Sequence, residues 1–312
     1  MNKLIRQLTI FVLAAFLLFD TSPVGARPPR SESSKVPVTT VVTVLAPNFT
    51  APPPVGKSDV IVYSGMQRQD VSALEPAQGD RSALQLAILI DDLSRIDTQL
   101  QELRKFIESL SKTTQVGVFY ADNGAVRTAA DFSTNHEAVA QKVRLTLGLS
   151  ASPVSIYISM MDFMSHWPAT DGRREFLVIA DGIDRFRGDP ASPDVPATIE
   201  KAQKAGITIH TLYAQGADYV AHNLFRLNYG QSNLAEMADA TGGQAFFQGL
   251  NTPISFTPLL DQLDMVLHNQ YFLTFTTDSS PKKKGELRAF RVRSEQHNVE
   301  IAAARRIFVP GP

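Results

Sequence analysis

Four carboxylates stand just after apolar runs of the sequence, and they are the residues most able to do chemistry. Asp91 and Asp92 follow the run Leu-Ala-Ile-Leu-Ile, and Asp181 and Asp184 follow the run Phe-Leu-Val-Ile-Ala. Ligands in open α/β sheets sit just beyond the carboxyl ends of the strands. We therefore expect these acids to meet at one sheet edge, where Asp91 and Asp181 would supply half of a metal site.

The elements that must position these acids alternate between strands and helices. Both apolar runs are continuous, as in strands buried on both faces of a parallel sheet. Residues 125–132 are predicted to pair with 116–120 across an Asn-Gly turn, which adds an antiparallel edge strand. The order β-α-β-β-α-α-β-α-β-α-β-α predicts the fold class: α/β, with a doubly wound, mostly parallel, Rossmann-like sheet.

Two helix boundaries follow from capping signals. Thr134 and Glu137 have the spacing of a capping box, which predicts a helix to about Leu147. Ser232 is predicted to cap a helix that runs through Ala240, which leaves 214–231 as a long loop at the carboxyl edge.

The chain is expected to divide into four parts. Residues 1–26 are a signal peptide, 27–83 a β-rich segment with a linker, 84–269 the α/β domain, and 270–312 a final β segment. The last segment alternates like exposed strands. We expect it to pack with residues 36–75 as a small β-sandwich-like subdomain.

The N-terminus has the pattern of an export signal. Lys3 and Arg6 precede a short apolar stretch, and Val24-Gly25-Ala26 offers a cleavage site. An uncleaved anchor is the alternative. After cleavage no membrane span is expected, and a secreted or periplasmic location in a bacterium is favoured, since the chain has no cysteine. The net charge of -1 gives no drive toward nucleic acid.

Enzyme motifs are missing from the sequence. There is no cysteine nucleophile, Gly-x-Ser-x-Gly elbow, Walker A loop or His-Glu-x-x-His pair. A hydrolase that uses the Asp91/Asp181 pair remains an alternative, but nothing around the pair indicates a sugar-binding cleft. A non-enzymatic role is favoured.

The order of these motifs resembles the von Willebrand factor A domain. The closest likeness is to the exported, Acidobacteria-type bacterial group called VWFA-related. The matching stretches are 59–76, 176–184, 230–247, 269–275 and 307–310. The resemblance implies a binding module whose metal-ion-dependent adhesion site holds Mg²⁺ or Mn²⁺ with Asp-x-Ser-x-Ser, a Thr and a second Asp.

This chain departs from the ligand pattern that the resemblance implies. The two Ser positions after Asp91 hold Leu93 and Arg95, and the Thr position falls on Val154 or Ser155. A slipped reading, Asp92-x-Ser94, recovers one hydroxyl. The site is therefore predicted to be degenerate with no cofactor, and an altered Mg²⁺ or Mn²⁺ adhesion site is the alternative. The candidate ligands are Asp91, Asp92, Ser94, Ser155 and Asp181.

Arg95 has two readings. Its guanidinium could replace the cation by pairing with Asp91 and Asp181, or it could point into solvent from the first helical turn. In either case the carboxyl edge is predicted to bind an unknown protein partner or surface ligand. The residues expected to form that binding edge are Asp91, Arg95, Asp181, Asp184, Tyr219 and Arg226.

Overall fold

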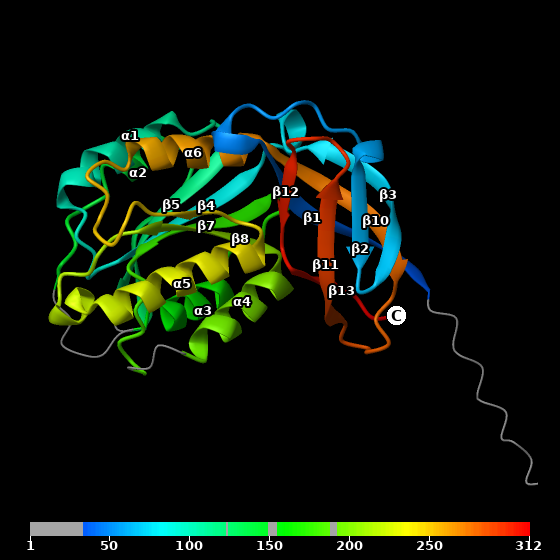
Figure 1. The fold of residues 1–312 in the computed structure, drawn as a ribbon. Coiled ribbons are helices and arrows are strands. Elements are labelled where there is room, and N and C mark those ends of the chain that lie inside the picture. Colours follow the sequence, from blue (N-terminus) through cyan, green and yellow to red (C-terminus); the bar gives the residue numbers. More distant parts are fainter. Residues whose placement is uncertain (1–33, 123, 149–154, 188–191) are drawn as a thin grey trace, which may run out of the picture. The chain divides into compact units, whose positions relative to one another are not determined.

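A six-stranded sheet forms the centre of the α/β part in the computed structural model, which describes residues 34–122, 124–148, 155–187 and 192–312 (Figure 1). Its order is β6-β5-β4-β7-β8-β9. The strands are β4 (Leu84–Asp91), β5 (Thr114–Asp122), β6 (Ala125–Ser133), β7 (Arg173–Ala180), β8 (Ile207–Tyr213) and β9 (Ala245–Phe246). All run parallel except β6, so the mostly parallel sheet with one antiparallel edge is as predicted. The predicted signal peptide and Val154 lie outside the described residues.

Helices cover both faces of this sheet (Figure 1). One apolar core holds residues of α1 (Leu100–Ser109), α2 (His136–Ala140) and α6 (Thr257–His268). The other holds residues of α3 (Ile156–Ser165), α4 (Asp194–Ala205) and α5 (Leu224–Thr241). Short 3-10 helices occupy Pro47–Phe49, Lys57–Asp59, Gly79–Arg81, Asp97–Gln99 and Tyr219–His222. No helix in the described part of the chain is long and apolar enough to cross a bilayer.

Two helices differ from the sequence prediction. The α2 helix ends at Ala140 rather than near Leu147, and the side chain of Asn135, not Thr134, caps its start. Residues 144–148 leave the helical path because they bond to the end of β4. The α5 helix begins at Leu224 instead of Ser232, since the Asn223 side chain accepts from two backbone N–H groups there. Much of the predicted loop is therefore helix.

The two ends of the described chain form one antiparallel sheet of seven strands, ordered β12-β1-β10-β3-β2-β11-β13. The strands are β1 (Lys35–Leu45), β2 (Val60–Ser64), β3 (Gln67–Pro76), β10 (Gln270–Asp278), β11 (Glu286–Ser294), β12 (Glu300–Ala303) and β13 (Arg306–Val309). This single sheet curls around its own apolar core, and it brings the strands of the final segment next to those of residues 36–75. The Phe290 N–H donates to the Arg305 carbonyl at 2.8 Å, which ties β11 to the bend between β12 and β13.

The α/β part is an insertion into this curled sheet. Strands β3 and β10 are neighbours, although the whole α/β part lies between them in sequence. The Ala77 N–H donates to the Gln270 carbonyl at 2.8 Å, so the chain enters and leaves the α/β part at one place.

A buried ionic cluster lies at this junction, at the start of β7. Glu175 accepts from His210 Nε2 at 2.8 Å and from Gln270 Nε2 at 3.1 Å. Arg173 donates to the Leu267 and Ser82 carbonyls and lies 3.8 Å from Glu175. His210 Nδ1 lies 3.1 Å from the Gln244 backbone nitrogen, which donates to it, and Nε2 faces Glu175. His210 is thus fully packed within its strand.

Candidate partner-binding edge

The carboxyl edge of the sheet, where β4, β7 and β8 end, is centred on one buried arginine. Arg185 Nη1 and Nη2 donate to the two oxygens of Asp181 at 3.0 and 2.6 Å. Its Nε and Nη2 donate to Asp218 at 2.7 and 2.9 Å, and Nη1 also donates to the Ile183 carbonyl at 3.3 Å. These contacts use all five donors of the guanidinium. The side chain is 6% exposed, so it has no N–H to offer a partner.

The backbone around Arg185 leaves no room for a larger residue at Gly216. Its N–H donates to Asp181 Oδ2 at 3.2 Å. A Cβ there would lie 2.5 Å from Arg185 Nη2 and 2.6 Å from Asp181 Oδ2, so glycine is required for the close approach.

Asp91 completes the charged cluster as its third carboxylate. Burial raises the pKa of Asp91 to about 7; Arg185 opposes this rise, and Asp181 and Asp218 add to it. Burial alone would lower the pKa of Arg185, but Asp181, Asp218 and Asp91 together hold it above its usual value. The cluster has more carboxylates than cations, and Asp91 absorbs the imbalance by keeping a proton up to neutral pH.

Arg95 does not take part in this cluster. Its side chain is exposed and donates to the Ala217 carbonyl at 3.3 Å. The solvent-facing reading of Arg95 is therefore the correct one, and Arg185 makes the carboxylate pairing that the other reading gave to Arg95. Arg95 does not reach the carboxylates because it lies in the bend after β4, where its backbone N–H donates to the Gln215 carbonyl. The signal for Arg185 is its position four residues after Asp181 in the same turn.

Asp92 forms a second carboxylate–guanidinium pair at the same edge, with Arg144. Arg144 Nη1 and Nη2 donate to its two oxygens at 2.8 Å each, and the Leu147 N–H donates to Oδ1 at 2.9 Å. The Arg144 guanidinium also lies 3.7 Å from the centre of the Tyr120 ring. The pairing of Asp92 with Arg144 and Leu147 explains why the residues after α2 cross the end of β4 instead of extending the helix.

Two of the candidate metal ligands, Asp92 and Asp181, are already paired with arginines. Asp181 and Asp92 have both oxygens bound by guanidinium groups. The Ser94 hydroxyl donates to the Ile179 carbonyl at 3.4 Å, and the buried Ser155 hydroxyl has no hydrogen-bond partner among the described residues. Among the described residues, no three His, Cys, Asp or Glu side chains are grouped to hold a metal. The positive charges paired with these acids belong to Arg185 and Arg144.

Several residues expected to contact a partner are inside the protein. Asp91, Asp181 and Asp184 are each no more than 6% exposed. Asp184 accepts from the Phe186 and Arg187 N–H groups and from Ser192, which shapes its own loop. These three acids therefore cannot touch a partner directly, because folding uses their oxygens. Of the remaining two, Arg226 is half-buried, and the Tyr219 side chain lies outside what the structure describes.

What the carboxyl edge exposes is apolar. Six large side chains are between 38% and 64% exposed in the segment after α2, which crosses the end of β4, and in the segments that follow β7 and β8: Leu145, Leu147, Phe186, Leu224, Phe225 and Tyr229. Phe225 and Tyr229 form an edge-to-face pair with ring centres 4.7 Å apart. We call these six residues the apolar rim. Sequence reasoning missed most of it because residues 214–231 were predicted to be a loop and residues up to about Leu147 a helix, so these side chains were not expected to share one edge.

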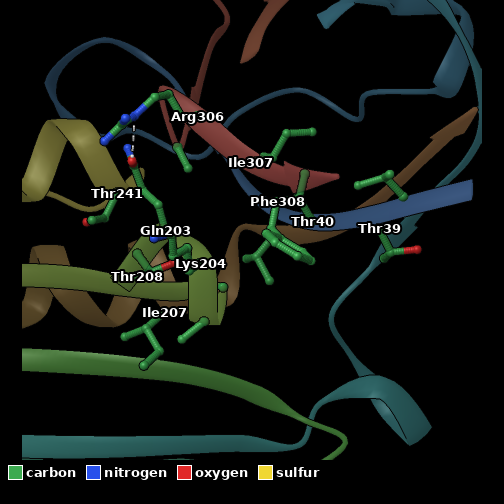
Figure 2. A pocket seen from close by; sticks show the side chains of 15 residues that line it. Thr39, Thr40, Gln203, Lys204, Ile207, Thr208, Thr241, Arg306, Ile307 and Phe308 are labelled. Carbon is green, nitrogen blue, oxygen red and sulfur yellow. Dashed lines mark hydrogen bonds between the residues drawn. The ribbon is translucent and has the colours of Figure 1, made fainter. Parts of the chain in front are cut away.

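A pocket of about 240 Å³ lies elsewhere, between the turn from α4 to β8 and strands β1 and β13 (Figure 2). Figure 2 shows Arg306 reaching Gln203, whose Oε1 accepts from Arg306 Nε at 2.9 Å. None of the predicted site residues lines this pocket. It marks the seam between the curled sheet and the α/β part, at the opposite end of the strands from Arg185.

Similar solved structures include von Willebrand A domains. Also similar is the structure of an aerotolerance-related membrane protein from Bacteroides fragilis, with 13% identity over 59% of this chain and 98% of that one, and a TM-score of 0.44. The ArnB paralog VWA2 from Sulfolobus acidocaldarius has 9% identity over 86% and 74%, with a TM-score of 0.37. The vWF domain of the pilus tip protein Mfa5 from Porphyromonas gingivalis has 11% identity over 59% and 94%, with a TM-score of 0.39.

No protein-family model matches the sequence. No curated protein matches it either. The strand order of the α/β part, its antiparallel edge and its strand-end carboxylates are those that the von Willebrand A resemblance implies.

Proposed function

We propose that this chain is a non-catalytic binding module of the von Willebrand A type, which holds a protein partner through its apolar rim without a metal ion. The observation that carries the proposal is the closed guanidinium of Arg185. A metal at this edge would leave a coordination position for a partner carboxylate, whereas Arg185 has no donor left. Affinity must then come from the rim around it.

The rim has the composition that supports such a role. Aromatic side chains bury much apolar area at a low entropic cost, and arginines beside them are favoured at interfaces. The Arg187 guanidinium lies 5.5 Å from the centre of the Phe186 ring. Arg95, which follows the end of β4, is also exposed. Exposed apolar side chains gathered in this way are typical of interaction sites.

Hydrolysis by the acid pair has no support in this arrangement. Both Asp181 oxygens are held by a guanidinium, so Asp181 cannot move a proton to a substrate. Secretion or periplasmic location remains part of the proposal and is supported by the N-terminal sequence pattern alone.

Capture of partners from the periplasm or medium of the source organism tests the proposal. The bait is the full chain after export, with Phe225→Asp and Leu147→Asp as rim variants. Met66→Asp is the matched control, because Met66 is 98% exposed in the β2–β3 turn. We expect a partner that is retained in EDTA, lost with either rim variant and kept by the control.

Two results would contradict the proposal. The first is a partner that both rim variants retain. The second is capture, or a rise in melting temperature, that requires Mg²⁺ or Mn²⁺, since a ligand that binds only the folded state raises its stability. That second result would favour the altered adhesion site.

A further inference from the structure

A groove lies between β9 and β12, the strands at one edge of each sheet. It consists of two adjoining hollows of about 500 and 510 Å³, which share Leu45, Gln244 and Glu300 in their linings. Both volumes are within the range of about 300 to 1,000 Å³ that small-molecule sites occupy. No residue of the apolar rim lines either hollow, so the groove is a separate surface.

Three segments far apart in sequence form the first hollow. Asn48 and Phe49 belong to the 3-10 turn after β1, and Gln244 stands just before β9. Asn298 lies in the connection from β11, and Glu300 begins β12. Four of these five side chains end in an amide or a carboxylate, and those four form no hydrogen bond to another part of the described chain. Their polar atoms are therefore available to a ligand.

The backbone around the first hollow is strained. The non-glycine residues of the described chain with positive φ are Asn48, Phe49 and Asn298, at 55°, 52° and 60°, and all three line this hollow. Asparagine tolerates the left-handed region, whereas a bulky phenylalanine seldom enters it. Residues held in such conformations gather at ligand sites, where the surrounding structure fixes them. The strain marks the hollow as a specific feature of the fold and not a chance gap between loops.

Each hollow has an aromatic ring in its lining. Phe49 lines the first, and its ring centre lies 6.4 Å from that of Phe246, which holds it in place. Phe247 lines the second and is 45% exposed. Both hollows share Gln244 and Glu300, so hydrogen-bonding groups lie where they meet. This arrangement suits a ligand with apolar faces and a polar rim.

The charges of the groove favour a neutral ligand. The lining of the first hollow contains Glu300 and no lysine, arginine or histidine. In the second hollow Arg291 and Arg305 are matched by Asp239 and Glu300, and Arg305 pairs with Asp239. An anionic ligand would meet the carboxylate of Glu300 in the first hollow without a cation to offset it.

We propose that this groove binds a neutral oligosaccharide. Sugar hydroxyls both donate and accept hydrogen bonds, as do the side-chain amides of Asn48, Gln244 and Asn298. The apolar C–H faces of the sugar rings lie on Phe49 and Phe247. Two adjoining hollows then hold consecutive units of one sugar chain, and the rim stays free for its own partner.

An array of immobilised oligosaccharides tests the class of ligand. The full chain after export is applied to maltohexaose, cellohexaose, mannohexaose and chitohexaose as neutral probes, and to an oligogalacturonate as the acidic probe. We expect at least one neutral probe to be retained and the oligogalacturonate to be washed away. Isothermal titration calorimetry with the neutral probe that is retained best then gives the Kd.

Two groove variants test the position of the site. Phe247→Ala should raise the Kd by roughly tenfold, because it removes the apolar surface under one sugar ring. Gln244→Ala should raise it by roughly three- to tenfold through loss of hydrogen bonds. Phe186→Ala and Gln67→Ala are the matched controls and should leave the Kd unchanged, since Phe186 is 53% exposed on the apolar rim and Gln67 is exposed on β3.

Asn298→Gly separates binding from folding. Glycine adopts the φ of 60° found there more readily than asparagine, so the melting temperature should not fall. The Kd should nevertheless rise by roughly three- to tenfold, because the amide is gone. An unchanged Kd would contradict the role of this turn in binding.

Three results would overturn the proposal. One is a failure to retain any neutral probe, and another is tighter binding of the oligogalacturonate than of every neutral probe. The third is the same Kd for wild type, Phe247→Ala and Gln244→Ala. The rim variants Phe225→Asp and Leu147→Asp should bind the sugar as wild type does, so failure of the groove and failure of the rim are distinguishable.

Discussion

The two ends of strand β7 carry buried ionic clusters of different balance. At its start, Arg173 and Glu175 provide one charge of each sign, with the side chains of His210 and Gln270 hydrogen-bonded to Glu175. Beyond its end, Arg185 faces three carboxylates, Asp181, Asp218 and Asp91. The first cluster fastens the α/β part to the curled sheet. The second has an excess of negative charge that only a proton can relieve.

The pKa shifts follow this difference. Burial would raise the pKa of Glu175, but His210, Arg173 and Gln270 hold it below its usual value. Burial raises the pKa of Asp91 to about 7 in spite of Arg185. The balanced cluster keeps its carboxylate charged at neutral pH, whereas the unbalanced one titrates near neutrality. The same strand therefore has one end that responds to pH only in acid and one that responds near neutral pH.

Removal of Arg185 should have the largest effect on the free energy of unfolding. Arg185→Met leaves three carboxylates without a cation, and we expect a loss of about 3 to 5 kcal/mol in the free energy of unfolding at pH 8. The loss should be smaller at pH 5, where Asp91 is protonated. Urea unfolding at both pH values measures it. Arg95→Met is the matched control and should change stability by less than about 0.5 kcal/mol. Equal losses for the two variants would contradict the assignment of Arg185.

Neutralising Glu175 should come next in size. Glu175→Gln keeps the shape but leaves Arg173 buried without its charge partner, for an expected loss of about 3 kcal/mol at pH 7. Because the pKa of Glu175 is lowered in the folded state, its contribution is present above the unfolded pKa and disappears as the pH falls. The difference between variant and wild type should therefore shrink in acid. Glu200→Gln, in an exposed pair with Lys204, should cost less than about 0.5 kcal/mol.

Neutralising Asp91 should have the smallest effect and the opposite sign. The folded pKa of about 7 lies above the unfolded value, so wild-type stability falls as the pH rises from about 4 through 7. Asp91→Asn removes that fall and keeps an oxygen for the Leu93 N–H. We expect a gain of about 1 to 2 kcal/mol at pH 8 and almost none at pH 5. Thermal unfolding across this pH range checks it, with exposed Asp97→Asn as the control. A variant less stable than wild type at pH 8 would refute the imbalance.

Much of the fold was open to prediction from the sequence because its signals are local. Continuous apolar runs marked β4 and β7, and the Asn-Gly turn marked the antiparallel edge. The errors came where tertiary contacts override local preference. Asp92 draws residues 144–148 away from the helix that Thr134 and Glu137 seemed to begin, and Asn223 starts α5 earlier than Ser232. Curling of the seven-stranded sheet depends on contacts far apart in sequence, such as that of Phe290 with Arg305.

The site was half predictable for the same reason. The strand-end position of Asp91 and Asp181 follows from the order of elements. Which arginine reaches them depends on the path of the turn after each strand, and that path is set by side chains such as Asp218 and by the space at Gly216. Arg95 and Arg185 carry the same guanidinium group, and each stands four residues after a strand-end aspartate, Asp91 or Asp181. Only the three-dimensional course of the loops separates them.

The insertion of the α/β part between β3 and β10 has a mechanical consequence. Tension applied between residue 34 and residue 312 passes through the strands of the curled sheet, because both of those residues belong to its side of the junction. The α/β part begins and ends at neighbouring points, Ala77 and Gln270, so the tension does not have to pass through it. A module built this way can be pulled from its two ends while its carboxyl edge stays unstretched, until the contacts of β1 with β10 give way.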